Sequence, residues 1–223
     1  MKAYQIKISL IGSNPLIWRR VIMPAFATFN RLNDIIQNVT NFESGYPYEP
    51  CHLFQFDLYK ENMKVTNDDE AYREHKYYMK NKKKIKKRLE SMDDEFSKNY
   101  LENLKTVIRK PAGKKIDDYL TKYKEIRYTY DFGDNWEFLI ELEKIVDDYK
   151  FGYPKLIDGA NTAPPEDVGG IPGFYEFLKI YKDKNHPDYL KVRNWADSQN
   201  YREYDKAHIN STLKFIKYKR NEK

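Results

Sequence analysis

Apolar and polar residues alternate with a period of two in four parts of the chain, which is the pattern of a β-strand with one buried face. The four parts are residues 4–10, 16–23, 52–59 and 126–143. The second has apolar residues on both faces and is therefore predicted to lie centrally in a sheet. The fourth is interrupted by turn residues at Gly133-Asp134, so it is predicted to form a β-hairpin at the centre of the fold.

The predicted hairpin has one face for the core and one for solvent. Its core face is expected to consist of Ile126, Tyr128, Tyr130 and Phe132 from the first strand and Trp136, Phe138, Ile140 and Leu142 from the second. Glu137, Glu141 and Glu143 alternate with the second set and are predicted to point outward. Trp136 is interpreted as an anchor of the core.

Apolar residues spaced by three and four positions predict helices elsewhere. The first begins at about Thr28 and is closed by Gly45 and Pro47, and a further helix begins at Pro172. Residues 115–123 are predicted to form a short helix or a connection, and two further helical segments are predicted at residues 186–196 and 206–218. Residues 158–170 contain two prolines and three glycines and are predicted to form an ordered, irregular loop. The tail from residue 217 is expected to be frayed.

Residues 60–112 differ in composition from the segments on either side. They contain fifteen Lys and Arg residues against ten Asp and Glu residues, and so carry five of the six net positive charges of the chain. Apolar residues in this segment recur every three to five positions, which predicts an inserted helical arm. Its most basic run has seven cations in nine residues, namely Lys80, Lys82, Lys83, Lys84, Lys86, Lys87 and Arg88. The run is either a solvated helix face or a surface for nonspecific, salt-sensitive phosphate contact.

Composition indicates one globular domain over residues 1–223. The chain is long enough to bury a core, and an aromatic content of 16% argues against disorder. The net charge of +6 favours anionic partners such as nucleic acid without establishing one. The single cysteine, Cys51, excludes an intramolecular disulfide and a multi-cysteine zinc site. Because there is neither a secretory signal nor an apolar run of about 20 residues, we expect a cytoplasmic protein without membrane contact.

Carboxylates at two turn-rich places are candidates for metal chemistry. Asp131 and Asp134 flank the hairpin tip, and Glu166 and Asp167 belong to a Pro-Pro-Glu-Asp loop that is expected to fold over it. Together with Glu137 and His52, they could bind Mg²⁺ or Mn²⁺, since carboxylates are hard oxygen ligands and a nuclease or phosphohydrolase needs two or three of them at one point.

The alternative for these residues is structural. Aspartates at turns accept hydrogen bonds from nearby backbone N–H groups. Glu166 and Asp167 lie close to the start of a predicted helix, whose dipole attracts negative charge. His52, beside strand residues, is interpreted as a hydrogen-bonded structural histidine as readily as a metal ligand.

Trp18, Arg19 and Arg20 form a second candidate site. Arginine can contact phosphates and aromatic rings can stack on bases, so the three residues suit a nucleic-acid surface. In a strand, however, Trp18 and Arg20 share a face, and we favour an internal ion pair between an arginine here and one of the candidate carboxylates.

Four motifs in order are similar to the plasmid pRiA4b ORF-3-like family: Ile17-Trp-Arg-Arg20, His52-Leu-Phe-Gln-Phe56, Tyr128-Thr-Tyr-Asp-Phe-Gly-Asp-Asn-Trp136 and Pro164-Pro-Glu-Asp-Val-Gly-Gly170. The resemblance implies an α+β roll, a curved mixed sheet with helices packed on it. Family members are often found on plasmids and mobile elements, and some are labelled insertion-element passenger proteins or resolvases. This chain departs from the common pattern in its basic insertion and in Val168, where a cysteine is often found.

The motifs of common enzyme classes are missing. The sequence has no phosphate-binding glycine loop, no HExxH, no GxSxG and no serine set suited to a recombinase. Our first hypothesis is therefore a noncatalytic binding or adaptor protein of a mobile element or phage, which engages a protein or nucleic acid through its sheet and basic arm. The second is a metal-dependent phosphodiester or nucleotide hydrolase that uses the clustered carboxylates. No cofactor is evident, although a divalent metal is compatible with these residues.

Overall fold

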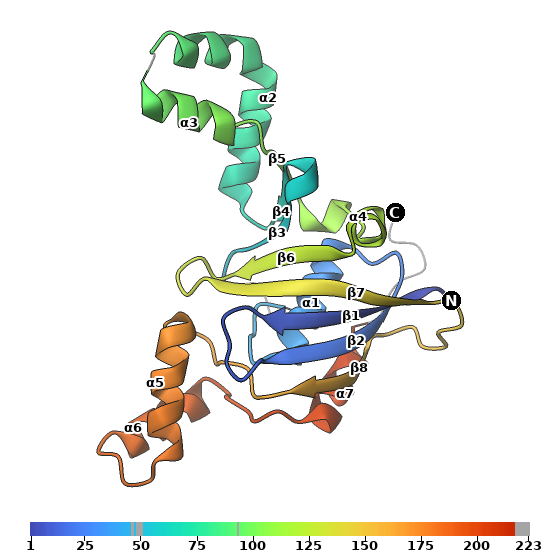
Figure 1. The fold of residues 1–223 in the computed structure, drawn as a ribbon, viewed down its shortest axis with the longest axis vertical. Coiled ribbons are helices and arrows are strands. Elements are labelled where there is room, and N and C mark those ends of the chain that lie inside the picture. Colours follow the sequence, from blue (N-terminus) through green and yellow to red (C-terminus); the bar gives the residue numbers. More distant parts are fainter. Residues whose placement is uncertain (46, 48–50, 93, 217–223) are drawn as a thin grey trace.

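The computed structural model describes residues 1–45, 47, 51–92 and 94–216. Its centre is a curved, open, mixed sheet of eight strands in the order β5-β4-β3-β6-β7-β1-β2-β8 (Figure 1). The strands are β1 Ala3–Leu10, β2 Trp18–Pro24, β3 Phe54–Leu58, β4 Met63–Thr66, β5 Val107–Arg109, β6 Glu125–Tyr130, β7 Trp136–Val146 and β8 Lys155–Ala160. Neighbours are antiparallel except for β4 and β5. The predicted α+β fold with a curved mixed sheet and packed helices is confirmed.

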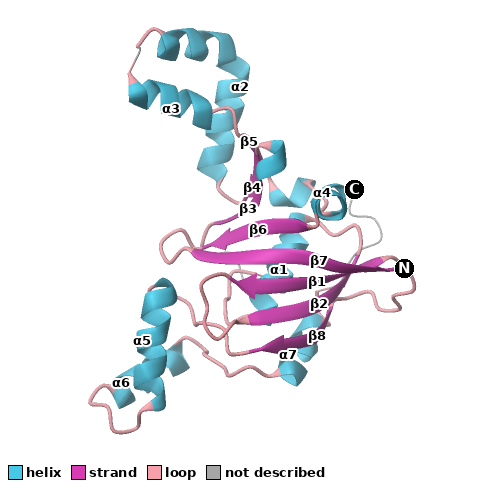
Figure 2. Ribbon diagram, in the orientation of Figure 1, coloured by secondary structure: helices cyan, strands magenta, loops and turns pink. Residues whose placement is uncertain are grey.

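Some of the helices cover one face of this sheet, and others project beyond its margins. The helices are α1 Phe29–Val39, α2 Asp69–Glu90, α3 Glu95–Asn103, α4 Asp117–Tyr123, α5 Gly170–Lys182, α6 Tyr189–Ser198 and α7 Lys206–Leu213. Figure 2 shows α1 and α7 behind the strands, whereas α5 and α6 lie at the lower left, below the tip of the β6–β7 hairpin. Helix α1 begins directly after Thr28, where its start was predicted, and Thr28 caps it because its hydroxyl accepts a hydrogen bond from the Arg31 amide. The last part of the helix predicted at 206–218, and the tail from residue 217, lie outside the described residues.

The four alternating stretches form strands β1, β2, β3 and the β6–β7 hairpin, as predicted. Strands β4, β5 and β8 were not predicted. The first two have four and three residues and lie in the charged segment, too short for alternation to be seen. Strand β8 contains Asp158-Gly159, which is typical of a turn, so the loop predicted at 158–170 is a strand in its first three residues. Strands β5 and β8 are the two edges of the sheet, and β4 lies next to β5.

The β6–β7 hairpin supplies the middle of the core. Tyr128, Tyr130 and Trp136 are fully buried, and Tyr130 is paired with Trp136 across the hairpin. The prediction that Phe132 is buried was wrong, because its side chain is 45% exposed. Asp131 adopts a left-handed conformation with φ of 52°, which ends the strand and its alternation one residue before Phe132.

The segment between β4 and β5 forms an arm that projects from the sheet (Figure 1). Helices α2 and α3 pack on each other around a small core separate from the main one, which consists of Tyr78, Leu89 and Leu104 with Ile85, Tyr100 and Leu101 at its margin. Asn81 has non-helical dihedral angles and divides α2 into two parts. The arm is connected at both ends to strands of the main sheet, because it follows β4 and precedes β5.

Strand β8 forms the sheet edge next to α7. The side-chain amide of Asn210 in α7 both accepts a hydrogen bond from the Leu156 amide at 2.9 Å and donates one to the Leu156 carbonyl at 3.0 Å. A side chain therefore satisfies the outward-facing backbone groups of Leu156, as a neighbouring strand would. Within the part of the chain that is described, no helix is both long and apolar enough to cross a membrane.

Candidate metal centre

Three segments meet at the hairpin tip. His52 lies two residues before β3, Asp131 directly follows β6, and Glu166 and Asp167 lie in the loop before α5. The Asp131 amide donates a hydrogen bond to the Leu53 carbonyl at 2.9 Å, which fixes the first two segments against each other. Asp131 and Asp167 both have positive φ angles, so each carboxylate is carried by a tight turn rather than by a strand or helix.

The imidazole of His52 lies between carboxylates on its two sides. Its Nδ1 is 3.6 Å from Oδ1 of Asp131, and its Nε2 is 3.6 Å from Oδ1 of Asp167 and 3.8 Å from Oε2 of Glu166. Ligand atoms of His52, Asp131 and Asp167 all lie within 4.8 Å of one another, so one ion can be reached by all three. These residues are grouped as candidates by their sequence, and the structure brings them together.

Glu166 is the most unusual member of this cluster. The residue is 6% exposed, and its Oε1 accepts hydrogen bonds from the Tyr130 hydroxyl and the Glu43 amide, both at 2.7 Å. Its Oε2 is buried, faces His52 and has no hydrogen-bond partner among the described residues. Burial raises the pKa of this carboxyl above its ordinary value, in opposition to the hydrogen bonds from Glu43 and Tyr130.

A hydrogen-bond network under the cluster holds His52 in place. The Ser44 hydroxyl accepts hydrogen bonds from the amides of Cys51 at 3.0 Å and His52 at 3.2 Å, and it lies 2.7 Å from the Tyr130 hydroxyl. Burial raises the pKa of Tyr130, so its hydroxyl keeps the proton that it donates to Glu166. The sequence pattern does not reveal this role of Ser44 or Tyr130, because alternation marks Tyr130 simply as a core residue.

Asp134 and Glu137 do not belong to the cluster of three. The Asp134 carboxylate accepts a hydrogen bond from the Gly169 amide at 3.0 Å, which is the structural use of a turn aspartate. A Cβ added at Gly170 would lie 2.7 Å from the Asp134 carbonyl oxygen, so the loop approaches the hairpin tip closely there. Glu137 is a residue of β7 paired with Thr129. Asp134 therefore fastens the loop that carries Glu166 and Asp167.

The cluster has the composition and dimensions of a divalent-metal site. Two ligands about 2.0 to 2.6 Å from one ion lie roughly 3 to 4 Å apart. For an ion at Nε2 of His52, the distances to Asp167 and Glu166 meet this condition, whereas the 3.6 Å contact of Asp131 is with Nδ1 on the other side of the ring. One nitrogen with several carboxylate oxygens suits Mn²⁺ or Zn²⁺. The Asp167 side chain is 61% exposed, so water and a substrate oxygen can approach the same point from solvent.

The Trp18-Arg19-Arg20 motif uses its two arginines differently. Arg20 does form an ion pair, but with Glu143 at 2.6 Å and Asp158 at 3.7 Å rather than with one of the carboxylates that the sequence suggested. Its guanidinium also lies over the Trp18 ring, on the same sheet face. Strand alternation places Arg19 on the opposite face, where it is buried. The predicted type of contact is present, with different partners.

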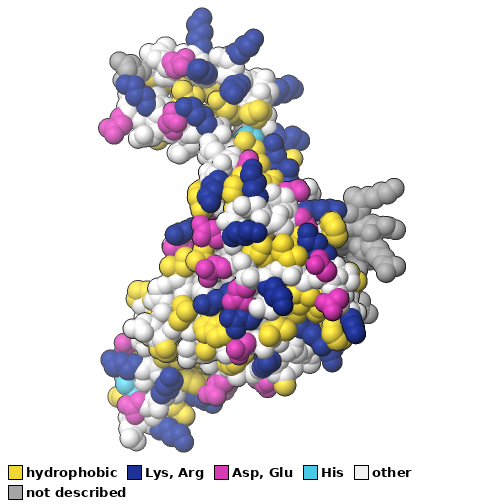
Figure 3. All heavy atoms as spheres, turned by 45° about the vertical axis from the view of Figure 1, so that its right-hand side comes forward, with side chains coloured by type: hydrophobic (Ala, Val, Ile, Leu, Met, Phe, Trp, Pro, Cys, Tyr) yellow, Lys and Arg dark blue, Asp and Glu magenta, His cyan; other side chains and the backbone are white. Residues whose placement is uncertain are grey.

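The cations of the basic run are all exposed on α2. In Figure 3, Lys and Arg side chains are spread over the arm at the top of the molecule. Among the described residues, Lys86 is the one member of the run with an ion-pair partner, Glu90, at 3.5 Å. The run therefore presents a largely uncompensated positive surface, compatible with both solvation and phosphate contact.

Fold and site together define an open α+β protein with a histidine–carboxylate cluster at the tip of its central hairpin. The chain belongs to the family described as plasmid pRiA4b ORF-3-like protein, whose model matches residues 2–212. It is similar to the uncharacterized protein y4hQ of Sinorhizobium fredii (strain NBRC 101917 / NGR234), with 23% identity over 197 residues that cover 88% of this chain and 82% of the relative.

A solved structure shares the fold. It is that of a protein of unknown function, MM3350, from Methanosarcina mazei Go1, with a TM-score of 0.65 and 29% sequence identity. The match covers 92% of this chain and 96% of the other. Neither of these two relatives carries a named activity, so function is inferred from the residues of this chain.

Proposed function

We propose that this protein binds one divalent metal ion at a centre formed by His52, Asp131, Glu166 and Asp167. The observation that carries the proposal is the buried Oε2 of Glu166, which faces His52 and accepts no hydrogen bond from the part of the chain that the structure describes. A buried carboxylate oxygen without a partner is costly, and a cation placed between Glu166 and His52 removes that cost. The same ion would neutralise the mutual repulsion of the three carboxylates.

The proposal is tested by titrating the purified protein with Mn²⁺ and Zn²⁺ in a calorimeter. We expect one ion per chain, and an affinity at least about tenfold lower in Glu166→Gln and Asp167→Asn, since each loses a charged ligand. Asp148→Asn is the matched control, because it removes an exposed carboxylate outside the cluster. Equal affinity in all four proteins, or no saturable binding to the native protein, would refute the centre.

The reaction class that such a centre favours is hydrolysis of a phosphodiester or nucleotide. An ion reached from solvent can lower the pKa of a bound water and polarise a phosphoryl oxygen. The exposure of Asp167 supports this reaction over a closed structural site. The test is Mn²⁺-dependent hydrolysis of bis(p-nitrophenyl) phosphate, which Asp167→Asn should abolish and Asp148→Asn should leave unchanged. A metal-loaded protein that hydrolyses neither this ester nor nucleotides would contradict the assignment.

A second candidate is noncatalytic binding of nucleic acid by an adaptor protein of a mobile element or phage. The exposed cations of α2 on a projecting arm favour it, and the plasmid origin of the family name supports the setting. We expect salt-dependent binding to duplex DNA in fluorescence anisotropy. The slope of log K against log salt should become shallower by about 0.9 for every phosphate that a variant no longer neutralises.

The variant for this test is Lys82→Gln/Lys83→Gln/Lys84→Gln on the arm. The control, Lys150→Gln/Lys184→Gln/Lys191→Gln, removes the same charge from exposed positions on the body. The second candidate is supported if the arm variant alone shows a lower affinity for DNA and a shallower slope of log K against log salt. An equal effect of the two triple variants indicates a contribution of net charge and contradicts a site on the arm.

A further inference from the structure

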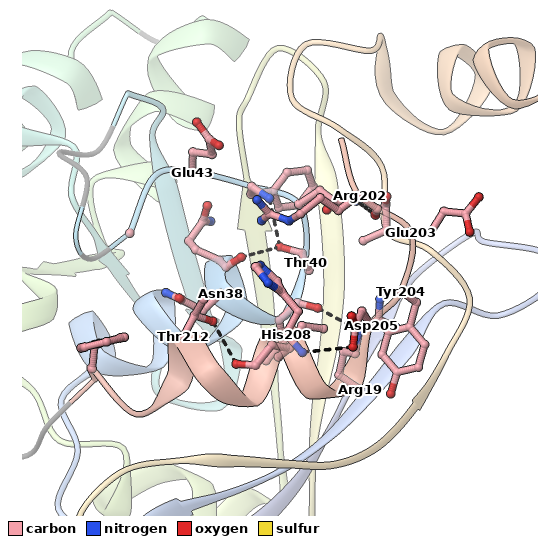
Figure 4. Close-up of a pocket in the computed structure, with 18 of the residues that line it drawn as sticks. Arg19, Asn38, Thr40, Glu43, Arg202, Glu203, Tyr204, Asp205, His208 and Thr212 are labelled. Carbon is pink, nitrogen blue, oxygen red and sulfur yellow. Dashed lines mark hydrogen bonds between the residues drawn. The ribbon is translucent and has the colours of Figure 1, made fainter. Parts of the chain in front are cut away.

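A pocket of about 430 Å³ lies on the helical side of the sheet, separate from the metal centre. It is formed by the C-terminal end of α1, the segment that follows α1, and residues 202–215 with α7. Figure 4 shows Arg19 and Tyr204 at one end of it and Glu43 at the other. The volume falls within the range of roughly 300 to 1,000 Å³ that small-molecule sites occupy.

Arg19 lines this pocket with a buried charge that no carboxylate neutralises within the described ranges. The residue is 3% exposed, and burial lowers the pKa of its guanidinium to about 10. No ion pair joins it to a carboxylate among the described residues, in contrast to Arg20 beside it, which has Glu143 and Asp158. Burial of a cation without a counter-charge costs free energy, and a charged group with a perturbed pKa in a cleft is a candidate for ligand binding.

The hydrogen bonds of Arg19 leave one edge of the guanidinium available. Its Nε donates to the Val39 carbonyl at 2.8 Å, and its Nη1 donates to the carbonyls of Trp18 and Ala160 at 2.8 and 2.9 Å. These contacts use three of the five N–H donors of an arginine. Nη2, with its two donors, has no hydrogen-bond partner among the described residues.

The surroundings of Arg19 hold it rigidly. The Tyr204 ring lies over the guanidinium, with 4.3 Å between its centroid and Cζ. A Cβ added at Gly159 would lie 3.0 Å from Cδ of Arg19 and 2.8 Å from the Trp18 carbonyl oxygen. The backbone of β8 at Gly159 therefore packs tightly against the Arg19 side chain. A fixed guanidinium edge loses little entropy when it binds a planar anion.

The other walls restrict the ligand further. Apolar side chains form part of the lining, namely Val39, Phe42, Ala163, Ile209 and Phe215. Charged and titratable side chains complete the lining, namely Glu43, Glu203, Asp205, Arg202 and His208. The three carboxylates outnumber Arg202 and His208, and they oppose a ligand with more than one negative charge. The chemistry that matches these walls is a single carboxylate at one end of an apolar body.

We propose that this pocket binds a small monocarboxylate whose apolar body lies between α1 and α7 and whose carboxylate accepts hydrogen bonds from Nη2 of Arg19. The proposed ligand contacts are made by other side chains than those of the metal centre, although Glu43 lines the pocket and its amide also donates a hydrogen bond to Glu166. It gives the protein a small-molecule ligand in addition to a metal ion.

The test is an NMR titration of the ¹⁵N-labelled full-length protein with 3-phenylpropionate. We expect saturable shifts of the Arg19 Nε–Hε signal and of amides in the lining. The neutral amide of the same acid should bind about 10- to 100-fold more weakly, because a charge-assisted hydrogen bond is lost. Inorganic phosphate should leave the Arg19 signal unchanged. Equal affinity for acid and amide, or a shift of Arg19 by phosphate, would overturn the proposal.

Variants on α7 test the location without touching Arg19. Thr212→Phe places an aromatic ring in the pocket, whereas Ser211→Phe adds the same ring at the adjacent exposed position that does not line it. Thr212→Phe should lower the affinity for 3-phenylpropionate at least tenfold, and Ser211→Phe should not. Unchanged binding in Thr212→Phe would place the ligand elsewhere and refute the site, provided that the melting temperature shows both variants to be folded.

Discussion

The hydroxyl of Tyr130 lies 2.7 Å from Oε1 of Glu166 and joins the centre of the sheet to the candidate metal centre. Tyr130 is fully buried and Glu166 is 6% exposed, so water does not readily replace this contact. The position of the carboxylate therefore depends on a residue of the core. This relationship makes Tyr130 a positioning residue whose loss should be felt at the metal.

Tyr130→Phe should lower both stability and metal affinity. Removal of the hydroxyl should cost about 1 to 3 kcal/mol in urea unfolding, because Glu166 loses a buried hydrogen bond. Metal affinity should fall about 10- to 100-fold in calorimetry, as for other residues that orient a ligand. Tyr128→Phe is the control, since its hydroxyl bonds Asn33 and Gln37 instead. It should cost similar stability, and an equal loss of metal affinity there would contradict the role of Tyr130.

Gly173→Ala should disturb the loop before α5. A Cβ at Gly173 would lie 2.0 Å from the Val168 carbonyl oxygen, so the backbone must move. We expect a loss of about 1 to 3 kcal/mol in stability, as for overpacking elsewhere, together with weaker metal binding because Asp167 is displaced. At Gly152 no atom lies within 4 Å of such a Cβ. Gly152→Ala should therefore match the native protein in thermal melting, and a larger effect there than at Gly173 would argue against this packing.

The ion pair of Arg20 with Glu143 should make stability depend on acid pH. The hydrogen bond from Arg20 is the main cause that lowers the pKa of Glu143 below its ordinary value of 4.5. The contribution of the ion pair to the free energy of unfolding is therefore complete above pH 4.5, and it is lost as the pH falls through the lower pKa that Glu143 has in the folded state. Because both side chains are partly exposed, the contribution should be no more than about 1 kcal/mol.

The measurement is unfolding free energy against pH for the native protein and Glu143→Gln. The variant should be less stable at pH 7, and the difference should shrink below pH 4.5. Glu141→Gln is the control, because it removes a carboxylate of the same strand that is not a partner of Arg20. This variant should leave the pH dependence of the unfolding free energy unchanged. A difference that persists undiminished at low pH would show that the pair has no such role.

The arm should unfold independently of the sheet. Leu89 is 6% exposed in the separate core of α2 and α3, so Leu89→Ala should cost the arm about 2 to 5 kcal/mol. Hydrogen exchange should accelerate across residues 69–103, while protection in β1, β6 and β7 stays unchanged. Met79→Ala, at a side chain that is 53% exposed on the same helix, is the control. Loss of protection in the central strands of the Leu89 variant would contradict an independent arm.

The sequence predicts the elements whose periodicity is long enough to be seen. The eight residues of β1 and the eleven of β7 alternate clearly, and both strands were predicted. The three residues of β5 cannot show a period, and Asp158-Gly159 disguises β8. The backbone angle of Asp131, which releases Phe132 to solvent, is set by the packing of hairpin against loop and is not visible in a local pattern.

The candidate site was predicted in part for the same reason. Acidic residues in turns can be grouped from sequence, and His52, Asp131 and Asp167 were. The partners that support them cannot, because Ser44 and Tyr130 meet through tertiary packing alone. The burial of Arg19 could not be predicted either. From sequence, an arginine in a strand is expected at the surface, whereas Arg19 is buried because helices cover its face of the sheet.

The contact between Asn210 and Leu156 has a consequence for association between molecules. An exposed edge strand can serve as a template on which a strand from another chain is added. At β8, the N–H and C=O groups of Leu156 that would pair with such a strand are already occupied by the amide of Asn210. The helix therefore obstructs extension of the sheet at this edge, and with it one route to domain swapping and fibrous aggregation.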